Sequence, residues 1–140
     1  MIQLIVGEKG KGKTKHLLDK VNTAVKSASG NIVYLDKNSK HMYELKNKIR
    51  LINVSEYPIN TSDEFVGFIC GIVSQDHDLE QMYLDSFLVI GNVPSHNDVE
   101  PVLDKLEKIS QLFDVDFIIS MSLDESELSE EYKSKVIVSL

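Results

Sequence analysis

The chain has one cysteine, one arginine and no long apolar run, and each shortage excludes a class of protein. The single cysteine, Cys70, cannot build a disulfide framework or a cysteine-rich metal site. No stretch approaches the roughly 18 consecutive apolar residues that cross a bilayer, so we expect no membrane span. The N-terminus carries no basic segment before its short apolar run, so we do not expect a signal peptide. Together these features predict a cytoplasmic protein.

The formal net charge of −7 argues against a general nucleic-acid binder, since phosphate backbones are held by clustered Lys and Arg. The charges are unevenly distributed along the chain. Acidic residues concentrate at positions 124–131, which we expect to form a solvated helix face or to dock a basic partner. Basic residues crowd the first twenty positions, at Lys9, Lys11, Lys13, Lys15 and Lys20. An acidic chain therefore carries one local basic segment.

A length of 140 residues and a hydrophobic content of 42% predict one domain, residues 1–140, with a sizeable core. Short apolar runs alternate with segments of helical spacing along the chain. Strands are expected at residues 2–6, 31–35, 49–54, 81–84, 116–121 and 136–140. Helices are expected around residues 17–28, 65–72 and 99–113. This order predicts a three-layer α/β/α fold with a mostly parallel sheet of about five or six strands.

Local signals refine this pattern. Gly30 follows the first helical segment and is expected to end that helix. Thr61 with Glu64, and Ser122 with Glu125, have the spacing of capping boxes that open helices. The apolar run at residues 87–90 fits either a continuation of the fourth strand or a separate element, and the pattern leaves both open.

The strongest motif lies where the first expected strand ends. Gly7-Glu8-Lys9-Gly10-Lys11-Gly12-Lys13-Thr14 matches G-x-x-x-x-G-K-[ST] at every fixed position. Glycines permit backbone conformations that other residues resist and let amides approach phosphate oxygens closely. The loop also opens a helix, whose first N–H groups are unpaired and whose dipole favours anions. A strand before it and an amphipathic helix after it favour a phosphate loop over a Gly- and Lys-rich surface turn.

In such a loop Lys13 would neutralise the β- and γ-phosphates of ATP or GTP, and Thr14 would ligate Mg²⁺ through its hydroxyl. Lys9 and Lys11 occupy variable positions, where they either add positive potential or are simply solvated. ATP is favoured over GTP because the guanine-reading pattern Asn-Lys-x-Asp is absent. Asn47-Lys48 lacks the aspartate that this pattern requires.

A nucleotide site of this kind usually has an acidic residue at the end of a second apolar strand, where it holds Mg²⁺. Asp85, after Met82-Tyr83-Leu84, fits this role best, and Asp36 is its rival. In a third interpretation Asp85 only caps a helix. Ser86 stands where many ATPases have a water-activating glutamate. The candidates for orienting water are Glu56, Gln75, Asn92 and Ser120, none of them clearly favoured.

These motifs are similar to those of the P-loop NTPase superfamily. The arrangement resembles its RecA-like branch, where a strand is inserted between the phosphate-loop strand and the Mg²⁺-aspartate strand. More narrowly, the chain resembles a group of short, uncharacterised bacterial ATP-binding proteins, some of which carry a twitching-motility label. The shared segments are residues 5–14, 52–57 and 83–85. The resemblance implies phosphate and Mg²⁺ binding at Gly7, Gly12, Lys13 and Thr14, with the second metal contact at Asp85.

Three functions remain open on these residues. The first is a small Mg²⁺–ATP-binding protein, with or without a weak or partner-activated ATPase activity, acting as a switch or subunit through a protein partner or self-association. The second is a small-molecule kinase, although Arg50 alone cannot supply the arginine-bearing lid that such kinases close over the phosphoryl group. The third is a structural binding module that has lost nucleotide turnover. The intact Lys13-Thr14 pair argues against this last interpretation.

Overall fold

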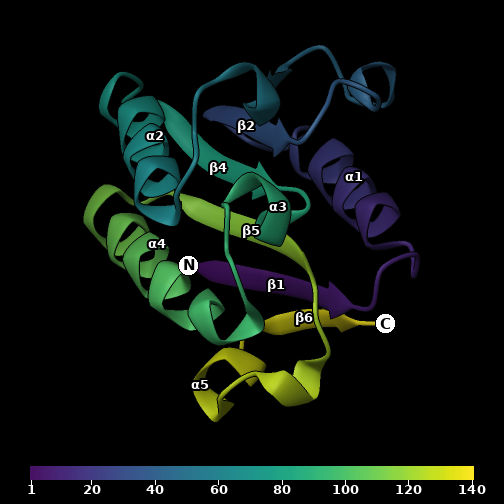
Figure 1. Cartoon of the computed structure of the whole chain (residues 1–140). Helices are drawn as coiled ribbons and strands as arrows, with labels where there is room; N and C mark the ends of the chain where they lie inside the picture. Colours follow the sequence, from purple (N-terminus) through teal and green to yellow (C-terminus); the bar gives the residue numbers. More distant parts are fainter.

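The computed structural model describes all 140 residues as one sheet flanked by helices (Figure 1). The six strands lie in the order β3-β2-β4-β5-β1-β6, and every neighbouring pair is parallel. Their bounds are β1 Ile2–Gly7, β2 Asn31–Asp36, β3 Ile49–Asn53, β4 Leu79–Leu84, β5 Asp116–Ser122 and β6 Val136–Ser139. The predicted α/β class and parallel sheet are confirmed. In this order β5 separates β1 from β4.

Helices cover both faces of the sheet, because alternate residues of each strand point to opposite sides. The helices are α1 Lys13–Ala24, α2 Ser62–Ser74, α3 Phe87–Ile90, α4 Val99–Phe113 and α5 Glu130–Lys133. Two separate apolar cores result. The larger packs α2, α3 and α4 on one face, and the smaller packs α1 on the other. None of these helices combines the length and apolarity needed to cross a bilayer.

The residues of the smaller core show which positions of the strands face α1. Tyr34 of β2, Tyr83 of β4 and Ile118 of β5 all belong to it. A residue two positions further along a strand points to the same face. This alternation directs Asp36, Asp85 and Ser120 toward the α1 side, at or near the carboxyl ends of their strands. The fold therefore gathers these polar groups beside the start of α1.

The prediction that Gly30 ends the first helix is wrong. Helix α1 ends at Ala24, and Gly30 does not adopt the left-handed conformation of a C-terminal glycine. The glycine serves a different purpose. A Cβ at this position would lie 2.4 Å from the carbonyl oxygen of Asp78 and 2.9 Å from Cβ of Glu80. Close approach of two backbones, which the local pattern does not reveal, explains the glycine.

The two predicted capping boxes are only partly correct. Thr61 caps α2 as expected and accepts a hydrogen bond from the N–H of Glu64 (3.1 Å), but Glu64 binds the N–H one residue before Thr61. In the second box the cap is Asp124, paired with Glu127, and it opens a short 3₁₀ turn. Ser122 instead belongs to β5, because pairing with β1 continues to that residue.

Residues 87–90 form the short helix α3 and do not extend β4. The strand ends because Ser86 takes a left-handed conformation, with φ of 57°. The N–H of Asp85 still donates to the carbonyl of Leu35 on β2 (2.9 Å). Asp85 is therefore held at the carboxyl end of β4, immediately before the chain turns away into α3.

Phe65 links α2 to the element that follows Asp85, because its ring packs against Phe87 of α3 with centroids 6.2 Å apart. Phe65 is fully buried, whereas Phe113 at the end of α4 is 58% exposed. We expect Phe65→Ala to lower the free energy of unfolding by about 3–5 kcal/mol, since it leaves a cavity in the core. Phe113→Ala, the matched control, should change it by under about 0.5 kcal/mol. Urea denaturation measures both, and equal losses would contradict this description of the core.

Candidate functional site

The loop between β1 and α1 depends on three glycines with positive φ. Gly7, Gly10 and Gly12 have φ of 149°, 85° and 90°, a region that side chains with a Cβ rarely adopt. At Gly7 a Cβ would also lie 2.9 Å from Cβ of Leu140. Space is open around the Cβ positions of Gly10 and Gly12, so at these two only the backbone conformation requires glycine.

The same loop presents a row of unpaired hydrogen-bond donors. No backbone N–H group of residues 8–15 donates to a carbonyl of the protein. Helix α1 begins at Lys13 without a side-chain cap, and Gly12 precedes it in a left-handed conformation. Successive N–H groups in such a turn, followed by a helix start, form a concavity that favours anions. The geometry therefore supplies a set of donors for a ligand rich in negative oxygens.

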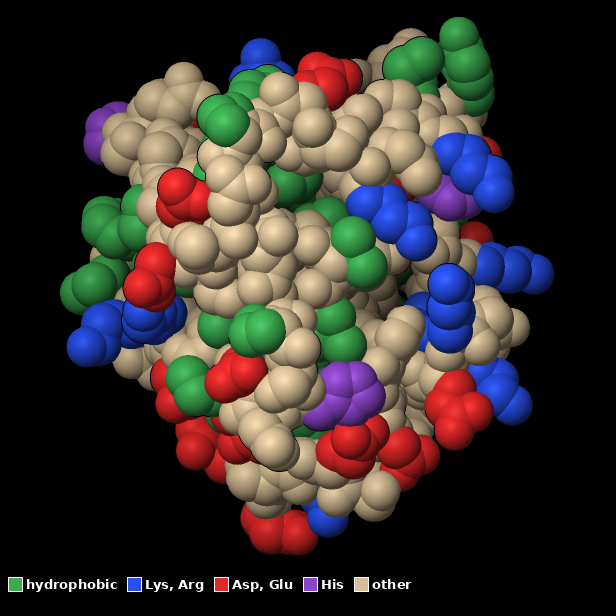
Figure 2. Space-filling view, in the orientation of Figure 1, with side chains coloured by type: hydrophobic (Ala, Val, Ile, Leu, Met, Phe, Trp, Pro, Cys, Tyr) green, Lys and Arg blue, Asp and Glu red, His purple; other side chains and the backbone are tan.

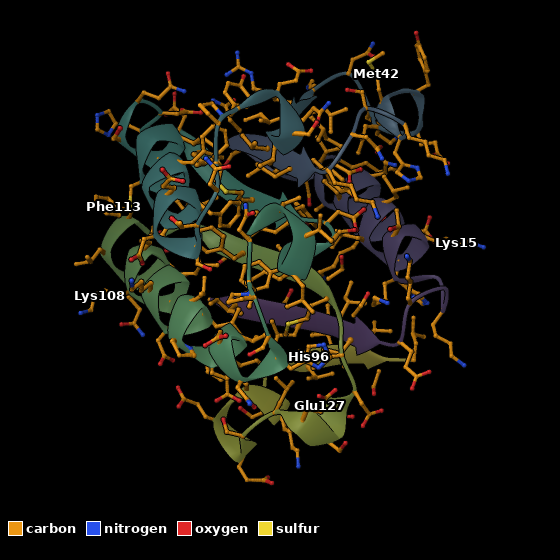
Figure 3. The ribbon with its side chains drawn as sticks, in the orientation of Figure 1. Lys15, Met42, His96, Lys108, Phe113 and Glu127 are labelled. Atoms are coloured by element: carbon orange, nitrogen blue, oxygen red, sulfur yellow. The ribbon has the colours of Figure 1, made fainter.

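Lys13 is the one buried lysine, with 8% of its surface exposed. Its Nζ donates to the carbonyl oxygen of Glu8 across the loop (2.8 Å). Burial lowers the pKa of Lys13, and the nearby carboxylate of Asp85 partly opposes this shift. A neighbouring lysine, Lys15, points away from the molecule (Figure 3). Of the lysines along this segment, only Lys13 is thus buried.

Asp85 is 2% exposed and accepts hydrogen bonds from three hydroxyl groups. Its Oδ1 accepts from Thr14 of α1 (3.1 Å) and from Ser120 of β5 (2.8 Å). Its Oδ2 accepts from the hydroxyl of Tyr34 on β2 (2.8 Å). Ser120 also accepts from the N–H of Ser86 (3.0 Å). The carboxylate therefore joins α1 to the two strands that flank β4.

Asp36 ends β2, the neighbour of β4, and is also 2% exposed. Its Oδ1 accepts from the N–H of Lys37 (2.7 Å), while its Oδ2 is buried without a partner in the protein. Burial raises the pKa of Asp36, and the charge of Asp85 raises it further. An unpaired buried carboxylate oxygen is costly and marks a candidate functional group.

These elements enclose a cavity of about 430 Å³ at the carboxyl ends of the strands. Its lining residues are Lys9, Gly10, Gly12, Lys13, Thr14, Lys37, Asp85, Ser86, Leu88, Val89, Ser120 and Ser122. The loop between β1 and α1 thus forms one wall, and Leu88 and Val89 of α3 add an apolar wall. Figure 2 shows Lys and Arg side chains on the side where α1 lies, and Asp and Glu side chains near α5. In parallel α/β sheets this edge is where ligands bind.

The cavity contains most of the residues that the sequence singled out, but not all. Lys13, Thr14, Asp85 and Ser120 line it together, whereas Glu8 takes part through its carbonyl group. Glu56 does not reach it: with Gln75 it lines a separate groove between the edge strand β3 and α2. The strand order explains why Glu56 lies outside the cavity. It follows β3, an edge strand that three other strands separate from β1.

Asn92 is also outside the cavity, because its side chain donates to the carbonyl of Ile59 (3.2 Å) and its carbonyl accepts from Ser62. Two contributors were missed by sequence reasoning. Lys37 directly follows a strand that ends at the same edge, so a signal for it existed. Tyr34 lies inside a strand, and nothing in the local pattern indicates that its hydroxyl reaches Asp85.

No protein-family model matches the chain, and no curated protein sequence matches it. What the structure defines is therefore a class of architecture: an α/β protein with an all-parallel six-stranded sheet flanked by helices. Its polar cavity lies where the first, second, fourth and fifth strands end.

Asp36 gives the site a signature in the pH dependence of stability. An aspartate in an unfolded chain has a pKa of about 3.9. Because the folded pKa is raised, the ionised form of Asp36 disfavours folding, and this penalty grows as pH rises from about 4 through the folded pKa. The unfolding free energy of Asp36→Asn minus that of the unmodified protein should therefore increase as pH rises. The difference should become constant once the pH is above the folded pKa. Urea denaturation from pH 4.5 to 8 measures the difference.

The control is Asp19→Asn on the exposed face of α1. The burial of Asp36 would be contradicted if its variant lost stability relative to the unmodified protein as the pH rose. The same conclusion would follow if the two variants showed identical trends.

Proposed function

We propose that this chain is a P-loop protein of the RecA-like branch that binds ATP with Mg²⁺, and that it is a weak or partner-activated ATPase. One observation carries the proposal: the N–H groups of residues 8–15 have no backbone acceptor, and Lys9, Gly10, Gly12, Lys13 and Thr14 of this segment line the same cavity as Asp85. A chain of phosphates matches this set of donors, because it offers several anionic oxygens in a row. The strand β5 between β1 and β4 supports the RecA-like assignment.

The residues present fit a Mg²⁺ ion that accompanies the nucleotide. Thr14 Oγ1 and Asp85 Oδ1 are 3.1 Å apart, and both are oxygen ligands of the kind that Mg²⁺ accepts. Mg²⁺ usually takes only one or two protein groups and completes its shell with water and phosphate oxygens. When bound, the ion would neutralise charge on the β- and γ-phosphates. Thr14 and Asp85 would hold it.

The remaining groups have distinct tasks in this proposal. Lys13 exchanges the carbonyl of Glu8 for phosphate oxygens, which are stronger acceptors for an ammonium group. Lys37, which follows β2 and also lines the cavity, adds positive charge near the phosphates. Asp36 does not line the cavity itself, but it directly precedes Lys37, which does, and its Oδ2 has no partner in the protein, so we assign it the role of accepting a proton from water. Ser120 stays hydrogen-bonded to Asp85 and orients that carboxylate.

A kinase is less well supported, because the one arginine, Arg50, lies on β3 and lines the separate groove. No arginine can therefore close over the cavity from within the chain. A partner protein or a second copy would have to supply such a charge if fast turnover is required. We accordingly propose a switch or subunit whose hydrolysis is slow in isolation. We propose ATP rather than GTP because the sequence lacks a guanine-reading motif.

Lys13→Ala tests nucleotide binding. Hydrogen bonds to charged groups contribute about 1.5–3 kcal/mol, so ATP affinity with Mg²⁺ should fall about 10- to 100-fold. Lys11→Ala is the matched control, because Lys11 is exposed on the same loop and does not line the cavity. Isothermal titration calorimetry measures both variants. Failure of the unmodified protein to bind ATP, or unchanged binding by Lys13→Ala, would contradict the proposal.

Asp36→Asn tests the hydrolytic part. A positioned general base contributes about 10²- to 10⁴-fold, so phosphate release should fall by at least about 100-fold while ATP affinity stays within a few-fold. Single-turnover phosphate release with protein in excess measures slow hydrolysis directly. Lys40→Ala, an exposed charge change on the segment after β2, is the control. If the unmodified protein releases no phosphate, or Asp36→Asn retains its rate, this role of Asp36 is wrong.

A further inference from the structure

The hydrogen bonds of Asp85 come from both strands beside β4. Tyr34 on β2 donates to Oδ2, and Ser120 on β5 donates to Oδ1, each at 2.8 Å. Because β4 lies between β2 and β5, the carboxylate is held from opposite sides. Such a carboxylate cannot rotate freely about its Cβ–Cγ bond without breaking a buried hydrogen bond, which costs about 1–3 kcal/mol. The remaining neighbour at Oδ1 is Thr14.

The hydroxyl of Tyr34 is separable from the packing of its ring. Tyr34 and Tyr83 are opposite each other in the β2–β4 pairing, and their rings are stacked with centroids 6.3 Å apart. Both rings are buried, at 0% and 1% exposure. The hydroxyl of Tyr83 donates to Gln81 (2.7 Å), away from the cavity residues. Only the hydroxyl of Tyr34 contacts Asp85, so the structure provides a matched pair of tyrosines.

The hydroxyl of Tyr34 is buried and donates to Oδ2 of Asp85. The oxygen that remains beside Thr14 is Oδ1.

The geometry of the carboxylate affects which cation fits. Mg²⁺ requires nearly octahedral coordination at short distances and uses carboxylates through one oxygen, directly or through water. Ca²⁺ takes six to eight oxygens, and carboxylates often bind it through both oxygens at once. Oδ2 is held toward Tyr34 on β2 while Oδ1 faces Thr14, so binding one ion through both oxygens would require the carboxylate to turn and break its bond to Tyr34. It can still contribute Oδ1 next to the hydroxyl of Thr14.

We infer that Tyr34 is a positioning residue that sets the cation specificity of this site. Working with Ser120, it restricts Asp85 to one oxygen and thereby favours Mg²⁺, or the similarly octahedral Mn²⁺, over Ca²⁺ as the ion that accompanies the nucleotide. This inference rests on the proposed function, since it concerns the ion that binds together with ATP.

The test compares ATP affinity in Mg²⁺, in Ca²⁺ and in EDTA, by calorimetry, for the unmodified protein, Tyr34→Phe and Tyr83→Phe. The unmodified protein should bind ATP more tightly with Mg²⁺ than with Ca²⁺. Tyr34→Phe should reduce this Mg²⁺-to-Ca²⁺ ratio by about tenfold, which corresponds to about 1.4 kcal/mol, and leave the affinity in EDTA unchanged. Tyr83→Phe should leave the ratio unchanged, because its hydroxyl does not contact Asp85.

Ser120→Ala provides a second, independent variant if Tyr34→Phe does not unfold cooperatively. It removes the donor from the β5 side and should move the ratio in the same direction. The inference is overturned if the variants that fold keep the ratio of the unmodified protein, or if Tyr83→Phe lowers it equally. An unmodified protein that binds ATP with equal affinity in Mg²⁺ and Ca²⁺ also overturns it, while the proposed nucleotide binding stands. No ATP binding in any of these solutions overturns both.

Discussion

The buried carboxylate of Asp85 is the constraint on which the site depends. A charge removed from water is tolerated only when its oxygens are hydrogen-bonded, and three hydroxyl groups from α1, β2 and β5 meet this need. These donors reach one carboxylate because the strand order places β4 between β2 and β5, with α1 over the same face. The hydrogen bonds of Asp85 therefore fix the start of α1, the loop before it and the strands β2 and β5 relative to one another.

Electrostatic balance follows from this arrangement. Lys13 is buried beside Asp85, and its pKa is lowered by burial more than the carboxylate raises it. An ammonium group in this position gains from additional negative charge, as do the unpaired N–H groups of residues 8–15. Asp36 adds a second buried carboxylate with an unpartnered oxygen. The cavity thus combines donors that suit anionic oxygens with the carboxylate of Asp85, and Asp36 lies next to Lys37 in its lining.

The sequence predicted the parts of the site that depend on local pattern. The loop was identifiable because its glycines and Lys13-Thr14 are adjacent in the chain, and Asp85 because an apolar run ends directly before it. Tyr34 was not identifiable, since its contact with Asp85 depends on the register of β2 against β4. Glu56, a candidate for orienting water, lies in a separate groove, and the sequence could not reveal this because strand order cannot be read from strand content. Gly30 was misassigned because its requirement comes from Asp78, a residue distant in sequence.

The central claim is that the loop at residues 7–14 binds a nucleotide with Mg²⁺ against Asp85. Two-dimensional amide NMR of the uniformly ¹⁵N-labelled chain, titrated with ATP and Mg²⁺, tests it most directly. If the loop binds the nucleotide, the largest chemical-shift changes will occur at the N–H groups of residues 8–15, with further changes at Ser86 and Ser120. Shifts that are absent there, or that instead concentrate around Glu56 and Gln75 in the separate groove, would contradict it.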